Sequence, residues 1–224
     1  MATSSQHSRL LTLAAREHLG SIGCTQKGRS RFWFDDHGWW AATVEFQPSS
    51  WSKGSYLNVG AMWLWHPADH WVFNEFDRVE PFHEFHDDAQ FHYVAAQLAE
   101  HAAAEVHTLR RKFDSVESVA KHLMKKPAEG LWPNYHAAIA ASLIGDMRAA
   151  KTHFDAVAAI PAVAPWEWVS DVQAKANRLA MSFTSLANAR EAIAVEVART
   201  REKLGLPKLP NMADLWNSPG ETPA

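Results

Sequence analysis

Cysteine is nearly absent from this sequence, and its continuous apolar runs are short. Of 224 residues only Cys24 is a cysteine, which excludes an internal disulfide and a cysteine-rich zinc knuckle and is typical of a reducing compartment. No uncharged apolar run approaches the roughly 18 to 20 residues of a membrane span. Arg9, Arg16, Glu17 and His18 interrupt the apolar residues near the N-terminus, so we expect no secretion signal there. The sequence therefore predicts a cytoplasmic protein without a membrane span.

A strong excess of positive charge is also missing. The chain has 22 lysine and arginine residues against 25 aspartate and glutamate residues, and its net charge at pH 7 is −3. Proteins that bind a phosphate backbone usually carry a basic surface, so this balance gives no strong signal for nucleic acid. The GxGxxG, P-loop, GxSxG and HExxH patterns are absent from the sequence. We therefore favour a protein that is not an enzyme and that has no cofactor.

What the sequence does contain is enough apolar material for a core and a clear change of period. Hydrophobic residues make up 47% of the chain, which suits one sizeable domain or two small ones. Apolar residues recur at helical spacing from Leu10 to Leu19 and predict a first helix. Alternating residues then predict three antiparallel strands, at about 31–34, 39–47 and 56–65, joined by two turns.

The rest of the chain returns to a helical period. We expect a short helix or an irregular arm at 70–76, and a long amphipathic helix from about Asp87 to Phe113. Prolines and glycines divide the remainder into shorter helices and a last long helix over 166–204. These patterns predict an α+β fold: an N-terminal helix packs on a small antiparallel sheet of at least three strands, and a mostly helical C-terminal half follows.

The domain organisation follows from the same patterns. We expect an α+β region that includes the long helix over 1–113 and a helical extension packed on it over 114–205. The proline-rich tail over 206–224 is expected to be extended and partly disordered.

One face of the predicted sheet is the first candidate for a binding surface. Strand alternation predicts a core face that carries Phe32, Phe34, Trp40, Val44, Phe46, Leu57 and Val59. The opposite face then mixes aromatic and polar groups, as recognition surfaces do; its members are Arg31, Trp33, Trp39, Glu45, Gln47, Tyr56 and Asn58. An exposed aromatic patch is costly unless something covers it. Either a partner or the C-terminal helices are therefore expected to cover this face.

The stretch EPFHEFHDDAQFHY, residues 80–93, is the second candidate because imidazole and carboxylate groups together bind zinc, iron or manganese. The alternative function is a metal-dependent hydrolase with Glu84 as general base and a divalent transition metal held by His83, His86, Asp88 and His92. Its geometry requires the first or the second histidine to fold back onto the following helix. The favoured interpretation is that the Asp-Asp pair caps that helix.

Tryptophan is unusually frequent, with 11 in the chain, and seven of them lie between Trp33 and Trp71. Most are expected to fill the core, because tryptophan buries a large area. A pocket in which the rings stack on a nucleotide or another small ligand is a third function that the pattern leaves open.

Three short motifs follow one another through the predicted sheet: Lys27-Gly28-Arg29, a strand that ends in Phe46-Gln47, and the sequence Asn58-x-Gly60. Together they resemble the core of an uncharacterised bacterial domain family, over about residues 18–66. Some members of that family are linked to toxin-immunity or conflict loci, so the resemblance implies binding of another protein rather than catalysis. The main hypothesis is a non-enzymatic cytoplasmic protein, immunity-like or accessory, that recognises another protein.

Overall fold

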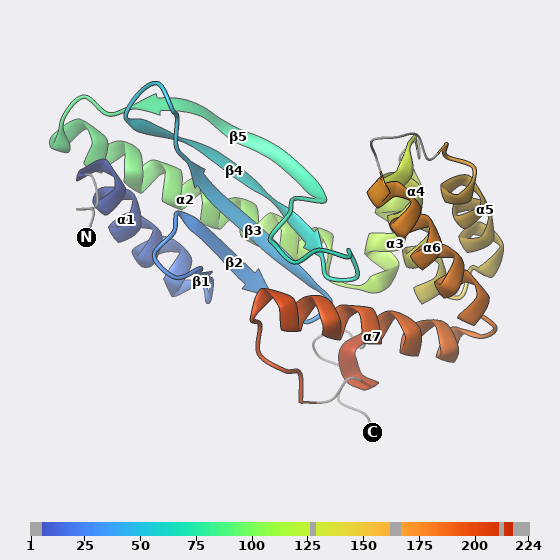
Figure 1. Cartoon of the computed structure of the whole chain (residues 1–224). Helices are drawn as coiled ribbons and strands as arrows, with labels where there is room; N and C mark the ends of the chain where they lie inside the picture. Colours follow the sequence, from blue (N-terminus) through green and yellow to red (C-terminus); the bar gives the residue numbers. More distant parts are fainter. Residues whose placement is uncertain (1–5, 126–128, 162–166, 211–212, 217–224) are drawn as a thin grey trace. The chain divides into compact units, whose positions relative to one another are not determined.

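A computed structural model describes residues 6–125, 129–161, 167–210 and 213–216 of the chain (Figure 1). The contacts divide the chain into two units. The sheet unit comprises residues 1–63 and 71–111, and the helical unit comprises residues 64–70 and 112–224. Each unit is described by itself below.

The sheet unit is built on a five-stranded antiparallel sheet in which the strands follow one another in chain order. A tight turn connects β2 to β3, and a turn over residues 48–53 connects β3 to β4, as the sequence predicted. The strands are β1 (Thr25–Gln26), β2 (Phe32–Asp36), β3 (Trp40–Gln47), β4 (Gly54–Trp63) and β5 (Glu75–Glu84).

Two helices pack on one face of this sheet, which we call the helix face. They are α1 (Gln6–Ser21) and the long helix α2 (Asp88–Lys112), which runs along the strands in Figure 1. The helices meet each other where the His7 ring of α1 lies 6.0 Å from the Phe91 ring of α2. The Asp87 carboxylate accepts a hydrogen bond from the main-chain N–H of Gln90 at 2.8 Å, so Asp87 caps the N-terminus of α2. The predicted long helix and its cap are confirmed.

The register of β2 differs from the prediction. Trp33 lies opposite Val44 and is buried, so it belongs to the helix face. Phe32 and Phe34 lie opposite Glu45 and Thr43, on the other face. The predicted placement of these three aromatic residues was therefore wrong by one residue, and in a strand a shift of one residue exchanges the two faces.

The helical unit contains α3 (Val116–Lys125), α4 (Leu131–Leu143), α5 (Met147–Ala158), α6 (Glu167–Ser182), α7 (Leu186–Leu204) and the short 3-10 helix η1 (Ala213–Trp216). Helix α4 is its centre, because 11 of its 13 residues are buried. Four of them are alanines, whose small side chains let neighbouring helices approach closely. Helices α4 and α5 form the predicted antiparallel hairpin, which turns at Gly145 with φ 83°.

The last predicted helix is wrong in extent. The last long helix is interrupted after Ser182. Ser185 caps the start of α7, because its side chain accepts a hydrogen bond from the main-chain N–H of Asn188. Of the two alternatives predicted for residues 70–76, the irregular arm is correct for 70–74, and β5 begins at Glu75. Within the proline-rich tail, the structure describes residues 206–210 and η1, and the remainder lies outside the described residues.

The α+β fold with a helical C-terminal half is as predicted. Packing of the helical extension on the sheet region stays a prediction. Among the described residues, no helix is long and apolar enough to span a membrane.

Candidate functional site

A hydrogen-bonded network lies on the sheet face opposite α1 and α2, which we call the polar face. The buried Asn58 side chain on β4 is its centre. Its Nδ2 donates to Glu45 Oε2 at 3.2 Å and to Gln47 Oε1 at 2.9 Å. Both acceptors lie on β3, and Glu45 is directly opposite Asn58 in the register. The structure thus brings together three of the residues predicted for this face.

Arg78 on β5 completes the network from the other side of β4. It pairs with Asn58 in the register, and its Nη2 donates to Gln47 Oε1 at 3.0 Å. Its guanidinium carbon lies 4.4 Å from the centre of the Tyr56 ring, which is within the range of a cation–π interaction. Tyr56, also predicted for this face, therefore belongs to the same group.

Arg78 is the member of the network that the sequence prediction missed. It was missed because residues 75–84 were not predicted as a strand. The alternation of exposed and less exposed side chains along β5 is weak, and Pro81 interrupts it. The distance in sequence between Asn58 and Arg78 could have indicated the pairing. It is long enough for the rest of one strand, a connection and the start of a returning strand.

Several polar groups of the network are not used within it. Among the described residues, Gln47 Nε2, Tyr56 Oη and Glu45 Oε1 have no hydrogen-bonding partner. Glu45, Gln47 and Tyr56 are half-buried and Arg78 is exposed. The network therefore holds donors and an acceptor in fixed positions at a surface that solvent reaches.

An aromatic cluster continues the polar face toward β2. Trp71 stacks on Phe34 with ring centres 4.6 Å apart and contacts Phe32 at 5.3 Å. The centre of the Phe73 ring is 6.1 Å from that of Phe32 and 5.3 Å from that of Phe76. Phe76 is 49% exposed. The polar face thus combines a charged network with an exposed aromatic edge.

The other three residues predicted for this face lie elsewhere. Trp33 is buried on the helix face, and Trp39 is buried and stacked on Trp63 with ring centres 6.4 Å apart. Arg31 turns toward α1, where its Nη2 donates to Ser8 Oγ. Burial lowers the pKa of Arg31. These placements correct the prediction: a buried side chain, or one that is bonded to the helix side, does not line the polar face.

The residues predicted for a metal site are spread over several elements. His83 on β5 bonds to Glu80 at 3.2 Å, and Asp88 accepts a hydrogen bond from Gln6 at 2.6 Å. His86 precedes α2, and His92 is exposed on that helix. In the described part of the chain, no three histidine, cysteine, aspartate or glutamate side chains are placed to hold a metal ion. The metal-dependent hydrolase stays a prediction without a described ligand group.

A buried ion pair fixes α2 to the helix face. Arg110 Nε lies 2.8 Å from Asp35 Oδ2, and Arg110 Nη2 donates to the Ile22 carbonyl at 2.6 Å. The same carboxylate oxygen bonds to His37 Nε2 at 2.5 Å. Although burial opposes ionisation, the hydrogen bonds from His37 and Arg110 lower the pKa of Asp35 to about 2. Asp35 is therefore a charged anchor at neutral pH, and not a proton donor.

The only cysteine lies beside this anchor. Burial, and next the negative charge of Asp35, raise the pKa of the Cys24 thiol to about 12. Because the thiolate is the nucleophilic form of cysteine, this site does not favour nucleophilic catalysis by Cys24.

No protein-family model matches the chain, and no curated protein or solved structure matches it significantly. The residues of the polar face are therefore the basis for assigning a function.

Proposed function

We propose that this chain is a non-enzymatic binding protein that recognises another protein through the polar face. The observation that supports this most directly is the network around Asn58, because it presents unpaired polar groups beside an exposed aromatic edge. Interfaces between proteins are enriched in arginine, tyrosine and other aromatic residues, and depleted of lysine. The polar face has this composition: Arg78, Tyr56 and Phe76 lie on it, and none of the residues identified on it above is a lysine.

The shape of the surface favours a protein over a small ligand. Small-molecule sites are concave and enclose most of the ligand. The polar face is the surface of a sheet, with side chains contributed by β2, β3, β4 and β5. A broad surface of this kind is suited to a partner that covers it, and such a cover would also remove Phe76 from water.

The network explains how the partner would be selected. Arg78 is held by Gln47, Asn58 and the Tyr56 ring, so its remaining N–H groups are preoriented for a carboxylate. A fixed guanidinium loses little conformational freedom on binding. We infer that the partner places an acidic side chain over Arg78 and an apolar one against Phe76.

The resemblance described for residues 18–66 supports the same class of function. Three of its motif residues, Phe46, Gln47 and Asn58, lie next to each other on β3 and β4, and two of these belong to the network. An immunity-like or accessory protein in the cytoplasm would use such a surface to hold a second protein. The buried free thiol of Cys24 is in keeping with that location.

The test is a comparison of variants in partner capture and affinity. Purified protein carrying Arg78→Ala or Phe76→Ser is compared with the unchanged protein in capture from a lysate of the source cells, and the captured protein is then purified for titration. We expect each substitution to weaken the complex by about thirtyfold or more, the effect of a typical interface hot spot.

Arg111→Ala is the matched control, because Arg111 is an exposed arginine on α2 that bonds only within its own helix. It should leave the affinity unchanged. Equal capture by all of the variants would contradict a role of the polar face in recognition.

A further inference from the structure

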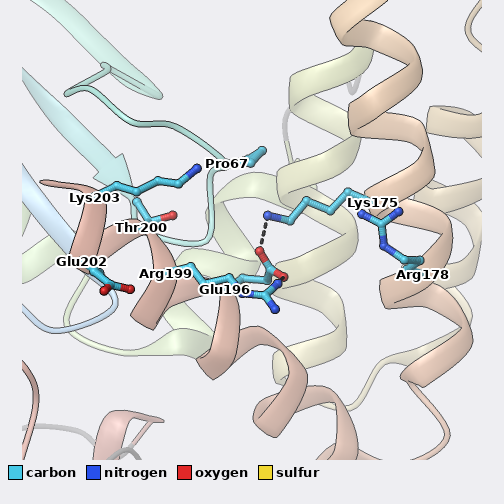
Figure 2. A pocket seen from close by; sticks show the side chains of 8 residues that line it. All are labelled: Pro67, Lys175, Arg178, Glu196, Arg199, Thr200, Glu202 and Lys203. Carbon is cyan, nitrogen blue, oxygen red and sulfur yellow. Dashed lines mark hydrogen bonds and ion pairs between the residues drawn. The ribbon is translucent and has the colours of Figure 1, made fainter.

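A pocket of about 270 Å³ lies in the helical unit, between α6 and α7 and beside Pro67. Figure 2 shows its lining and the Lys175 side chain reaching from α6 to the Glu196 carboxylate on α7. All of its lining residues belong to the helical unit. Pockets for drug-sized ligands have volumes of about 300 to 1,000 Å³, so this one suits a small ligand or one end of a larger one.

The lining of the pocket is predominantly positive. Its cations are Lys175, Arg178, Arg199 and Lys203, and its carboxylates are Glu196 and Glu202. With four cations and two carboxylates, the lining has a surplus of two positive charges. The whole chain, in contrast, has a net charge of −3. The pocket is therefore positively charged, although the protein as a whole is negatively charged.

Glu196 fixes two of the cations in place. Its carboxylate forms an ion pair with Lys175 through Oε2 and with Arg199 through Oε1, the latter at 2.7 Å. The Glu196 side chain is only 10% exposed and that of Lys175 only 16%. A carboxylate buried to this degree between two cations is already neutralised, and it adds little to the charge that a ligand meets.

The other two cations are available to a ligand. Within the part of the chain that the structure describes, neither Arg178 nor Lys203 forms a hydrogen bond or an ion pair. Arg178 extends from α6 and Lys203 from α7, and in Figure 2 they lie on opposite sides of the Lys175–Glu196 ion pair. The charge of Lys203 contributes to lowering the pKa of Asp69, but the Asp69 carboxylate is hydrogen-bonded to His70 at 2.8 Å and not to Lys203.

The crowding of positive charge is also visible at Lys175. Burial lowers the pKa of Lys175, the ion pair with Glu196 opposes this, and the charges of Arg199 and Lys203 lower it further. A bound anion would relieve this repulsion.

We propose that the pocket between α6 and α7 binds the phosphate group of a small phosphorylated molecule, held between Arg178 and Lys203. A phosphate monoester carries a charge of about −1.5 to −2 at pH 7, which matches the surplus of the lining. It also has three acceptor oxygens, so it accepts hydrogen bonds from two helices at once. A carboxylate carries a single charge and would leave one of the two cations without a partner. This ligand is independent of the protein partner proposed for the polar face.

The experiment is a titration of the full chain at a constant ionic strength set with chloride. Binding is measured by the shifts of amide signals in NMR spectra and by calorimetry. The probes are inorganic phosphate, glycerol 3-phosphate and succinate, a dianion without phosphorus. We expect both phosphates to shift amides of α6 and α7, and succinate to bind at least about tenfold more weakly. Tighter binding of glycerol 3-phosphate supports an organic phosphate, and equal binding supports inorganic phosphate as the ligand.

The variants Arg178→Gln and Lys203→Gln test the two cations. Both side chains are exposed and have no partners, so the variants should fold. Each should weaken phosphate binding about tenfold, the effect of one hydrogen bond to a charged group. Lys121→Gln, an exposed lysine on α3, is the matched control and should bind as the unchanged protein does.

Two results would overturn the proposal. In the first, succinate binds as tightly as the phosphates, which would show that the pocket selects charge alone. In the second, the Arg178→Gln/Lys203→Gln double variant retains the phosphate affinity of the unchanged protein.

Discussion

Replacing Arg110 by methionine is the sharpest test of how the sheet unit is held together. The substitution keeps most of the length of the side chain but removes the guanidinium that binds Asp35 at 2.8 Å and the Ile22 carbonyl at 2.6 Å. The Asp35 side chain is only 10% exposed. The variant therefore leaves a buried carboxylate with His37 as its one remaining bonded partner among the described residues.

The magnitude follows from the burial of this pair. Removing one partner of a buried ion pair costs about 3 to 5 kcal/mol, because the other charge stays buried without compensation. Here the Arg110 side chain is 27% exposed and His37 remains, so both circumstances reduce the cost. We expect the free energy of unfolding at pH 7 to fall by about 3 kcal/mol.

The pH dependence provides a second, independent sign. The folded pKa of Asp35 is lowered from 3.8 to about 2, so the unfolded chain takes up a proton first as the pH falls. This contribution is complete above pH 4 and is lost between about pH 4 and pH 2. Nearly two pKa units correspond to about 2 kcal/mol. In the Arg110→Met variant this loss between pH 4 and pH 2 should be smaller, because the contribution of Arg110 is gone while the hydrogen bond from His37 remains.

The assay is urea unfolding monitored by circular dichroism at pH 7, 4, 3 and 2. Arg111→Met is the control, since Arg111 is the neighbouring residue, is exposed, and bonds only to Thr108 of its own helix. If Arg110→Met destabilised the protein no more than the control did, Asp35 and Arg110 would not be coupled as the structure indicates.

Three further predictions concern single residues. Gly60→Ala should destabilise the sheet unit by about 3 kcal/mol, because a Cβ at this position would overlap a main-chain oxygen of β5. Gly20→Ala in α1 meets open space and should stabilise the protein by about 1 kcal/mol. Urea unfolding of both variants measures the two effects. Cys24, with its pKa raised to about 12, should resist alkylation at pH 8 until the protein is unfolded, as mass spectrometry of iodoacetamide adducts would show. Burial lowers the pKa of His66 from 6.5 to about 4, so this histidine alone should lower the free energy of unfolding by about 3 kcal/mol from pH 6.5 to pH 4. Urea unfolding at the two pH values should therefore show a smaller fall for His66→Phe than for the unchanged protein.

The sequence predicted the strands whose two faces differ in character. In β3 and β4, apolar residues such as Val44 and Val59 alternate with polar ones such as Glu45 and Asn58, so the faces of these residues were predicted correctly. In β2 the alternation is between aromatic residues on both faces, and period alone does not say which of them is buried. The register with β3 decides this, and register is a property of the assembled sheet.

Two other differences have local physical causes. The helix predicted over 166–204 contains no proline or glycine in its middle, so nothing in its composition marks the break before α7. Ser185 caps the start of α7. Serine also occurs inside helices without capping them, so its presence in the sequence does not by itself predict a break. The strand β5 was missed because its pairing with β4 includes an irregular register near Leu57, where a simple period of two is lost.

The polar network could serve stability alone, and the same variant that tests recognition also decides this. A network that only ties strands together is expected to satisfy its own polar groups, but here Gln47 Nε2 and Tyr56 Oη have no partner among the described residues. Arg78 is exposed, and exposed charged interactions contribute about 0 to 1 kcal/mol. We therefore expect Arg78→Ala to lower the free energy of unfolding by less than about 1 kcal/mol while it weakens partner binding about thirtyfold. If urea unfolding showed instead a loss above about 2 kcal/mol, the network would be a structural tie between β3, β4 and β5, because the energy of those bonds would then be used within the fold.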